Sequence, residues 1–459
     1  MTATVHVVGA GVAGLSCAVR LARAGRHVAV HEAAGQAGGR CRSFHDATLD
    51  RLIDNGNHLL MSGNRAVRGY LEDIGSVDSL IGPVPAEYPF LDLQSGLRWV
   101  VRPNAGPFPW WIFSAGRRVP DTRPRDYLRG LRLAWAGRET TVAACLGTDE
   151  ALFRRFWEPL AVAVLNTSAT EGAASLMWPM IAQTFGRGEA ACRPLVARRS
   201  LSDSFIDPAL AFLDRNGCPS RFNHRLRSLR FEQDRVAGLD FGADPVAVAP
   251  GDCVVLAVPP AGAAALVPGI VAPGTSRAIV NGHFRLATRR QDLEFLGLVG
   301  GTCQWLFVRG DIASVTVSAA DALADQPSAA IAGRFWADVT RALGLGDAPL
   351  PLHRIVKEKR ATFAQTPAEV ARRPGTRTAW KNLCLAGDWT DTGLPVGEAD
   401  QGPLYRRVET VLLRPRLVQR CRQCLQHACL TSPRGRRHAR VDAALAVYFT
   451  AFPSILRHL

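Results

Sequence analysis

Three glycines and one acid near the N-terminus have the spacing of a dinucleotide-binding turn. Gly9, Gly11 and Gly14 lie between an apolar strand and an apolar helix. Gly9 permits a tight turn, Gly11 lets the backbone approach a pyrophosphate at the helix N-terminus, and Gly14 lets the helix pack closely on the strand. Glu32 ends the following strand, where a carboxylate meets ribose hydroxyls. The alternative is a plain glycine turn in a βαβ unit, but the strand–turn–helix context and Glu32 favour a nucleotide cofactor.

The composition is that of a globular protein with a strong positive charge. The chain has 459 residues, enough for two or more domains, with 47% hydrophobic and 21% charged residues. Its net charge of +15 comes almost wholly from arginine, because Lys357, Lys359 and Lys381 are the only lysines. No nucleic-acid-binding module or dense Lys/Arg run accompanies this charge, so we expect no nucleic-acid partner and favour an anionic membrane surface. A genome that favours arginine codons explains the charge equally well.

The cysteines and the apolar stretches predict a cytoplasmic chain that does not cross a membrane. Eleven cysteines are scattered along it, and Cys17, Cys253 and Cys384 lie in apolar elements, so we expect reduced thiols. No positively charged segment precedes the apolar residues at the N-terminus, which argues against a signal peptide. The apolar stretches 253–272 and 443–456 are interrupted by proline or too short to span a bilayer.

Two segments have the composition of a surface or tunnel for apolar molecules. Residues 83–120 are rich in Pro, Gly and Trp, which suits a ligand tunnel, an interfacial aromatic belt or plain core strands. The spacing in Arg125–Ala136 predicts an amphipathic helix with arginines on its polar face. Such a helix either lies in a membrane interface or packs its apolar face on its own protein. The predicted apolar face consists of Tyr127, Leu128, Leu131 and Trp135.

Several sequence blocks resemble those of one flavoenzyme family. Gly38-Gly39-Arg40, shortly after Glu32, resembles the Gly-Gly-Arg signature of FAD-dependent amine oxidases and phytoene desaturases. More specific blocks, running from about Val5 to Pro395, are similar to the hydroxysqualene dehydroxylases, also called squalene-associated FAD-dependent desaturases. These blocks are Asp54-Asn55-Gly56-Asn57-His58-Leu59-Leu60 with Ser62-Gly63-Asn64, Trp157-Glu158-Pro159-Leu160, Leu165-Asn166-Thr167, Glu358-Lys359-Arg360-Ala361-Thr362-Phe363 and Thr390-Asp391-Thr392-Gly393-Leu394-Pro395. Gly387-Asp388, at the end of an apolar strand, is a second cofactor signature.

The resemblance implies an α/β fold with a discontinuous, Rossmann-like FAD-binding domain and an α+β substrate domain, as in FAD-dependent amine oxidases. The FAD-binding domain would comprise residues 1–75, 200–274 and 376–396, and the substrate domain residues 76–199 and 275–375. Residues 397–459 would be a divergent basic tail. No second Gly-x-Gly-x-x-Gly follows, so we do not expect a built-in NAD(P)H domain.

FAD is the cofactor that the resemblance implies. In the superfamily the Gly-Gly-Arg backbone passes close to the cofactor, and the strand that contains Val254 lies beside its adenine half. Asp388 follows a buried strand and would accept hydrogen bonds from the ribityl or pyrophosphate region. The predicted cofactor-binding residues are Gly9, Gly11, Gly14, Glu32, Gly38, Gly39, Arg40, Val254, Gly387 and Asp388.

Four residues are candidates for acid chemistry. The block that contains Asp54 and His58 crosses near the flavin ring in the superfamily, which implies proton donation or orientation by these two residues. A simple turn at Asp54 and a packing role for His58 are equally consistent with the sequence. Glu158 lies on a helix that faces the cavity in relatives, although its place before a proline also suits a helix start. Lys359, in another family block, is a further candidate.

The resemblance implies that the chain reductively removes the hydroxyl of hydroxysqualene to give squalene for hopanoid synthesis. Protonating the allylic hydroxyl leaves a delocalised cation that takes hydride from reduced flavin, in a site that excludes water. An external electron donor is then required, and the expected location is cytoplasmic, peripherally on the inner face of the cell membrane. The alternatives are a polyprenoid desaturase, an amine oxidase-like enzyme, for which no aromatic cage is recognisable, and a flavin-free membrane scaffold.

The resemblance ends after Pro395. Relatives continue with a small-residue helix whose N-terminus supports the flavin, whereas Pro403 and Pro415 interrupt any such helix here. A frameshift explains an intact body joined to an unrelated tail and predicts weaker FAD binding; a genuine basic appendage is the competing explanation. A Cys-x-x-Cys-x-x-His-x-Cys run from Cys421 lacks the usual loop between ligand pairs, so we predict no metal site.

Overall fold

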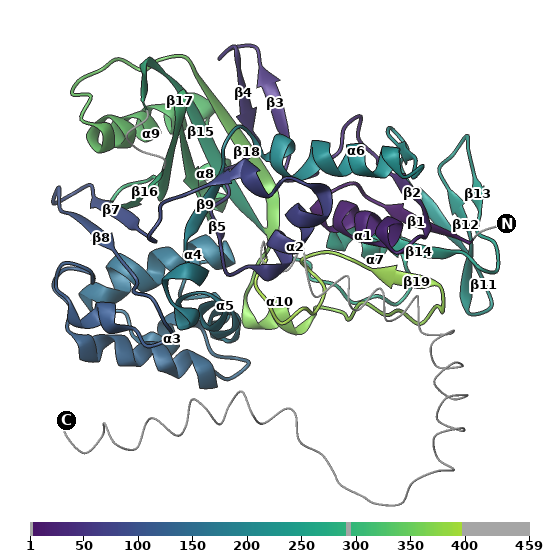
Figure 1. Ribbon diagram of the computed structural model, residues 1–459, viewed down its shortest axis with the longest axis horizontal. Coiled ribbons are helices and arrows are strands. Elements are labelled where there is room, and N and C mark those ends of the chain that lie inside the picture. Colours follow the sequence, from purple (N-terminus) through teal and green to yellow (C-terminus); the bar gives the residue numbers. More distant parts are fainter. Residues whose placement is uncertain (1–2, 291–294, 397–459) are drawn as a thin grey trace, which may run out of the picture. The chain divides into compact units, whose positions relative to one another are not determined.

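A five-stranded parallel sheet forms one layer of the protein, seen at the right of Figure 1 in a computed structural model that describes residues 3–290 and 295–396. The strand order is β10-β2-β1-β14-β19, and every neighbouring pair is parallel. Because the strands come from distant parts of the sequence, the chain leaves this sheet and returns to it more than once. The strands are β1 Thr4–Val8, β2 His27–His31, β10 Ser220–Arg221, β14 Cys253–Leu256 and β19 Leu383–Leu385.

Helices pack on this sheet because its strands are apolar on both faces. Val5 and Val7 of β1 are fully buried against helix α1, whereas Val8 belongs to a second core cluster with β14 and β19. The thiols of Cys17 and Cys384 are buried in the same core, and burial raises the pKa of each to about 12. The helices of this part are α1 Val12–Arg23, α2 Arg65–Ile74, the π-helix η8 Ser202–Ile206, α6 Asp207–Arg215 and α7 Pro260–Leu266.

A second, six-stranded sheet has the order β18-β15-β17-β16-β7-β8 and is antiparallel except between β16 and β7. Helix α9, Ser328–Leu343, packs on β15, β17 and β18 and buries Phe335 and Trp336 there. The strands are β7 Tyr88–Asp92, β8 Arg98–Val101, β15 Ser276–Arg290, β16 Phe295–Val299, β17 Trp305–Val317 and β18 His353–Phe363.

Short helices between residues 110 and 191 gather below this sheet in Figure 1 around a core rich in aromatic residues. Trp99, Trp111 and Trp157 are all buried in that core. The helices are η2 Trp110–Phe113, η3 Pro124–Trp135, α3 Val142–Leu146, η4 Phe153–Trp157, α4 Glu158–Leu165, η5 Ala174–Leu176, α5 Met177–Gln183, η6 Phe185–Arg187 and η7 Glu189–Ala191.

The remaining elements are short and connect these layers. Strands β3 and β4 form an antiparallel pair, β9 bridges β5 and β6, and β11, β12 and β13 form a small antiparallel sheet. Their bounds, with the other helices, are β3 Ser43–Asp46, β4 Arg51–Asp54, β5 Leu60–Met61, η1 Val77–Ser79, β6 Leu80–Ile81, β9 Pro194–Ala197, β11 Ser228–Glu232, β12 Arg235–Asp240, β13 Val246–Ala247, α8 Asp321–Ala324 and α10 Pro367–Ala371.

The predicted fold class is confirmed. All five strands of the parallel sheet fall within residues 1–75, 200–274 and 376–396, the ranges expected for the FAD-binding domain. The six-part division of the chain stays a proposal, and the tail and its cysteine run lie outside the described residues. Within the part of the chain that the structure describes, no helix has the length and apolar character needed to cross a bilayer.

A helix is present at the segment Arg125–Ala136, as predicted, but the predicted α-helical period is wrong. The segment is a 3₁₀-helix, η3, which has three residues per turn. Gly130 and Leu133 are buried, and Gly130 faces the Trp157 ring so closely that a Cβ there would overlap it. The α-helical spacing therefore assigned Leu128, Leu131 and Trp135 to a face that the structure leaves exposed.

Candidate active site

The glycine turn after β1 has the geometry that its sequence predicts. Gly9 has φ +108°, and a Cβ there would overlap the carbonyl oxygen of Ala257. A Cβ at Gly14 would overlap the carbonyl oxygen of Gly9. Around the Cβ position of Gly11, by contrast, no other atom of the described residues lies within 4 Å. The packing of the protein therefore requires glycine at positions 9 and 14, whereas the Cβ position of Gly11 borders open space.

That open space lies at the N-terminus of α1. Gly11 is the N-cap residue and offers no side chain to the free amides, and the first turn contains no acidic residue. The helix therefore presents unpaired N–H donors and partial positive charge, which bind a phosphate group. Gly38, with φ +110°, donates its N–H to the oxygen of Ala10 at 2.8 Å and so brings the Gly-Gly-Arg backbone against the turn. The surroundings fit a pyrophosphate.

Glu32 holds the turn from the end of β2. Its carboxylate accepts hydrogen bonds from the backbone N–H of Ala10 at 2.7 Å and of Ala34 at 2.8 Å. A carboxylate has about four acceptor positions, so two are left for the ribose hydroxyls of a nucleotide. The side chain is only half-buried, which keeps those positions accessible.

The two cofactor signatures meet through an ion pair. Arg40 donates to the buried carboxylate of Asp388 at 2.7 Å and to the oxygen of Ala361 at 2.6 Å. Gly387, with φ +145°, allows the sharp turn that delivers Asp388 from the end of β19. The structure thus joins residues 348 positions apart in the sequence.

A buried arginine that the sequence did not single out fixes the loop after Asp388. The guanidinium of Arg373 donates to the backbone oxygens of Asp388 at 3.0 Å, Thr390 at 2.6 Å and Leu394 at 2.9 Å. It also donates to the hydroxyl of Thr392 at 2.9 Å. Arg373 lies before the Gly-Asp signature in a stretch without any motif, so nothing in the sequence marked it.

Asp54 joins three segments that are remote in sequence. Its buried carboxylate accepts hydrogen bonds from the hydroxyl of Ser43 at 2.6 Å, the backbone N–H of Leu201 at 2.9 Å and the guanidinium of Arg309 at 2.9 Å. All three partners donate to its carboxyl oxygens and hold the side chain in one orientation. This geometry favours an orienting role over proton donation.

The residues after Asp54 are tied to the six-stranded sheet. Asn281, in β15, donates to the oxygen of Asn55 at 3.2 Å, and Asn57 donates to the hydroxyl of Thr316, in β17, at 3.0 Å. Thr316 in turn donates to Asn281 at 2.7 Å. Asn281 is 1% exposed and directly follows the apolar run Ala278-Ile279-Val280, and a polar residue after such a run was the signal that could have revealed this network.

His58 follows this segment directly. Desolvation lowers the pKa of its imidazole, with Arg40 acting in the same direction and Asp54 opposing it. The residue is nevertheless exposed to solvent. Arg40, of the Gly-Gly-Arg signature, is one of the two charged groups that act on the pKa of His58.

The structure does not bring the other candidates to this place. Lys359 is exposed on β18 and pairs with Asp325 at 2.8 Å. Its neighbour Glu358 points to the opposite face of the strand, where Asn55 donates to it at 3.5 Å. Glu158 begins α4 with an exposed side chain. Val254 lies inside the parallel sheet with no exposed surface, so it packs there and reaches no ligand through its side chain.

Comparison with known proteins places this geometry in a family. Residues 12–289 match the family described as flavin containing amine oxidoreductase. The chain is 47% identical over 396 residues to the hydroxysqualene dehydroxylase of Rhodopseudomonas palustris, a match that covers 86% of this chain and 94% of the relative. It is 46% identical over 395 residues to the hydroxysqualene dehydroxylase of Sinorhizobium fredii, with the same coverage. The chain belongs to the hydroxysqualene dehydroxylase family, within the flavin-containing amine oxidoreductases.

Solved structures of more distant proteins share the fold. Putrescine oxidase bound to putrescine superposes with a TM-score of 0.65 at 16% identity, covering 91% of this chain and 99% of that one. Cyclohexylamine oxidase from Brevibacterium oxydans gives a TM-score of 0.62 at 14% identity, covering 90% and 99%. The protein is thus an FAD-dependent oxidoreductase, as its sequence predicted, and the glycine turn, Glu32 and the Arg40–Asp388 pair fit that cofactor.

Proposed function

We propose that this enzyme removes the hydroxyl group of hydroxysqualene to give squalene. The observation that carries the proposal is the identity of 46–47% over 94% of the length of two hydroxysqualene dehydroxylases. The chemistry also suits the site, because the substrate is a long hydrocarbon with a single hydroxyl and His58 supplies a titratable group beside the segment that Asp54 fixes. Squalene would then feed hopanoid synthesis.

FAD in its reduced form, when bound, supplies a hydride to the allylic carbon. The reaction consumes one proton and one hydride, and the hydroxyl leaves as water. The helix N-terminus at Gly11 and the carboxylate of Glu32 would hold the cofactor's pyrophosphate and ribose. The Arg40–Asp388 pair, fixed by Arg373, would orient its ribityl side.

We assign proton transfer to a ring nitrogen of His58 and an orienting role to Asp54. The lowered pKa of His58 makes its protonated form a stronger acid toward the leaving hydroxyl. Asp54 favours that protonated form and fixes the strand end that precedes His58 through Ser43, Leu201 and Arg309. Proton donation by His58 predicts a rate that rises as the pH falls below 7, because the protonated fraction grows.

The test is anaerobic conversion of hydroxysqualene with chemically reduced FAD. His58→Ala should lower the rate by roughly 10²–10⁴-fold and keep the flavin, a range typical of a lost general acid. Asp54→Asn should lower the rate less and shift the acid limb of the pH profile. His45→Ala is the matched control, because the side chain of His45, on β3, is 62% exposed and lies 3.3 Å from the carboxylate of the exposed Asp50. Wild-type rates in both site variants would place the proton donor elsewhere.

Product analysis separates this proposal from its alternatives. Squalene as the product supports dehydroxylation, whereas a more unsaturated polyprenoid would indicate a desaturase and an aldehyde an amine oxidase-like enzyme. An external electron donor is required, and its identity is a separate question. We further propose that the protein works at the inner face of the cell membrane, which is supported by its net charge of +15 and by the apolar nature of its substrate.

A further inference from the structure

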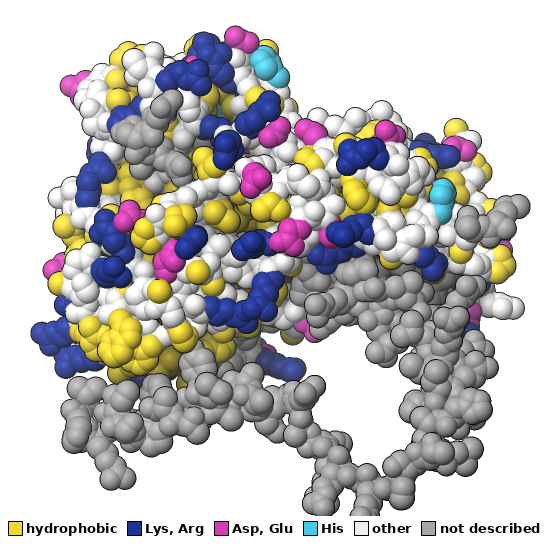
Figure 2. All heavy atoms as spheres, viewed as in Figure 1, with side chains coloured by type: hydrophobic (Ala, Val, Ile, Leu, Met, Phe, Trp, Pro, Cys, Tyr) yellow, Lys and Arg dark blue, Asp and Glu magenta, His cyan; other side chains and the backbone are white. Residues whose placement is uncertain are grey.

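One surface of the protein exposes large apolar side chains that a water-soluble face seldom carries. Trp110 is 64% exposed and Trp135 is 74% exposed. Figure 2 shows a hydrophobic patch at the lower left, with Lys and Arg side chains at its edges. We call this surface the aromatic face, and its members are Phe108, Trp110, Phe113, Leu128, Leu131 and Trp135.

The geometry of two short helices produces the aromatic face. In η3 a repeat of three residues turns Tyr127, Gly130 and Leu133 inward and leaves Leu128 and Leu131 in one outward row. Helix η2 contacts η3, and Trp110 packs against its neighbours Phe108 and Phe113 with ring centroids 4.3 Å and 6.0 Å away. The exposure is therefore built into the backbone and does not depend on rotamer choice.

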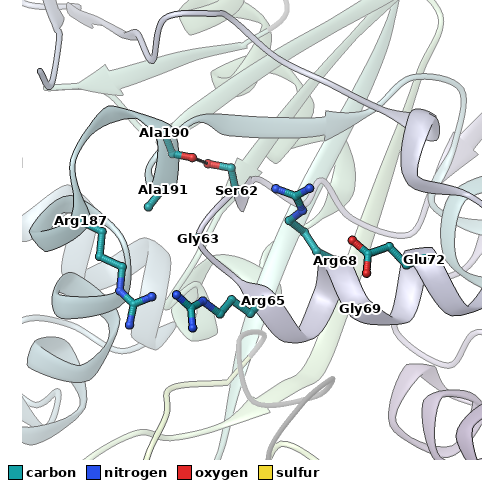
Figure 3. Close-up of a pocket in the computed structure, with 9 residues that line it drawn as sticks. All are labelled: Ser62, Gly63, Arg65, Arg68, Gly69, Glu72, Arg187, Ala190 and Ala191. Carbon is teal, nitrogen blue, oxygen red and sulfur yellow. Dashed lines mark hydrogen bonds between the residues drawn. The ribbon is translucent and has the colours of Figure 1, made fainter. Parts of the chain in front are cut away.

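An arginine-lined recess lies next to this face. It has a volume of about 360 Å³ and opens between the N-terminus of α2 and the turn formed by η6 and η7. Figure 3 shows the guanidinium groups of Arg65 and Arg187 facing one another across it, with Arg68 above. Within residues 3–290 and 295–396, none of these three arginines has an ion pair, although Glu72 also lines the recess. The recess therefore carries an excess of positive charge.

The wall of the recess packs directly on the loop that carries the aromatic face. Gly188, with φ +84°, lies so close to Gly106 that a Cβ would overlap the carbonyl oxygen of that residue. Glu189 donates its N–H to the oxygen of Asn104 at 2.9 Å, and the side chain of Asn104 accepts from the N–H of Trp111 at 2.9 Å. The backbone that forms one wall of the recess is thus fixed to the loop that leads into η2.

We propose that this surface docks on a bilayer that contains anionic phospholipids, with a headgroup phosphate in the arginine recess and the aromatic face in the interface. Residues 104–138 contain seven arginines and two aspartates, so the charge around the apolar side chains is complementary to such a bilayer. Tryptophan and arginine together are typical of membrane–water interfaces. The inference rests on the proposed function in one respect, because the proposed substrate is a long hydrocarbon that dissolves in the membrane.

The experiment is co-sedimentation of the full-length FAD-loaded protein with two types of vesicle. One type contains phosphatidylcholine alone, and the other contains phosphatidylcholine with about 30% phosphatidylglycerol, an anionic lipid. We expect binding only to the anionic vesicles, and weaker binding with added salt. Arg65→Gln with Arg187→Gln should weaken that binding roughly 30-fold and flatten the salt dependence. Trp110→Ser with Trp135→Ser should weaken it at every salt concentration.

Arg334→Gln is the matched control, because Arg334 is an exposed arginine on α9 whose side chain hydrogen-bonds to Gln326. Equal binding of all variants, or equal binding to both vesicle types, would overturn the proposal. Displacement by millimolar inorganic phosphate at constant ionic strength would mean that the recess binds free anions instead. Vesicle-independent dimerisation that the tryptophan variants abolish would make the aromatic face an interface between two copies.

Turnover of detergent-dispersed hydroxysqualene separates this inference from the proposed function. The docking variants should keep normal flavin content and normal turnover in detergent, because neither group of residues contacts the Asp54–His58 segment. A wild-type protein that binds vesicles but does not convert hydroxysqualene would refute the proposed function alone.

Discussion

Replacing Gly11 with valine should separate cofactor binding from folding. Gly11 has φ −73° and ψ 175°, values that valine adopts without strain, and its Cβ position borders open space. Gly14→Ala is the matched control, because a methyl group there overlaps the backbone oxygen of Gly9. Both variants add a side chain to a glycine of the same turn. We expect Gly11→Val to lose FAD binding and keep its stability, and Gly14→Ala to lose stability.

The magnitudes follow from what each side chain would meet. In the apoprotein, Gly11→Val should change the free energy of unfolding by no more than about 0.5 kcal/mol, as for a surface substitution. Its isopropyl group would occupy the space of the pyrophosphate and remove at least two charge-assisted N–H bonds, which costs about 3–6 kcal/mol, or roughly 10²–10⁴-fold in FAD affinity. Gly14→Ala should lower the free energy of unfolding by about 3 kcal/mol, because the strand and helix must move apart.

The assay measures bound flavin per protein by absorbance and the unfolding of each apoprotein in urea. We expect Gly11→Val to be folded and colourless, and Gly14→Ala to be destabilised. A Gly11→Val protein with a wild-type flavin ratio would refute the assignment of this turn to the pyrophosphate. Unfolded Gly11→Val apoprotein would instead refute the argument that the space beside it is open.

Two further predictions concern buried groups. Arg373→Leu should lower the free energy of unfolding by about 2–4 kcal/mol and weaken FAD binding, because backbone oxygens of the loop after Asp388 lose their donor. Arg373→Lys should restore part of the stability and part of the FAD binding. Unchanged flavin retention in Arg373→Leu would contradict the role of Arg373 in fixing this loop. Burial lowers the pKa of His31 to about 3 and of His283 to about 4, so the unfolded chain binds more protons than the native protein below pH 6.5. The free energy of unfolding should therefore fall by about 2 kcal/mol for each of them between pH 7.5 and pH 5, and a flat profile in urea unfolding over this range would show that both are protonated in the folded state.

The sequence by itself determined the cofactor and its main binding elements. The turn at Gly9, Gly11 and Gly14 lies between a strand and a helix that are adjacent in the sequence, so a short stretch of sequence predicted its geometry. The same holds for Gly387, whose positive φ only glycine adopts readily. The family blocks added FAD and the substrate class, and the comparisons confirmed the family.

Only the tertiary structure decided how the chemical groups are arranged. Asp54 obtains its three donors from Ser43, Leu201 and Arg309, which no local pattern links. Asn55 faces Glu358 across 303 positions, and the exposed Lys359 beside it shows that one step along a strand reverses the side of the sheet.

The aromatic face shows why such features escape sequence analysis. Hydrophobic spacing grouped Leu128, Leu131 and Trp135 with Tyr127 on one apolar face, because it assumed 3.6 residues per turn, and it left open whether that face is buried. The ring of Trp157, 27 positions from Gly130, occupies the space beside the helix, and the chain adopts three residues per turn with Gly130 and Leu133 inward. Which side chains meet solvent was thus set by a packing partner remote in sequence, and spacing within the segment carries no information about that partner.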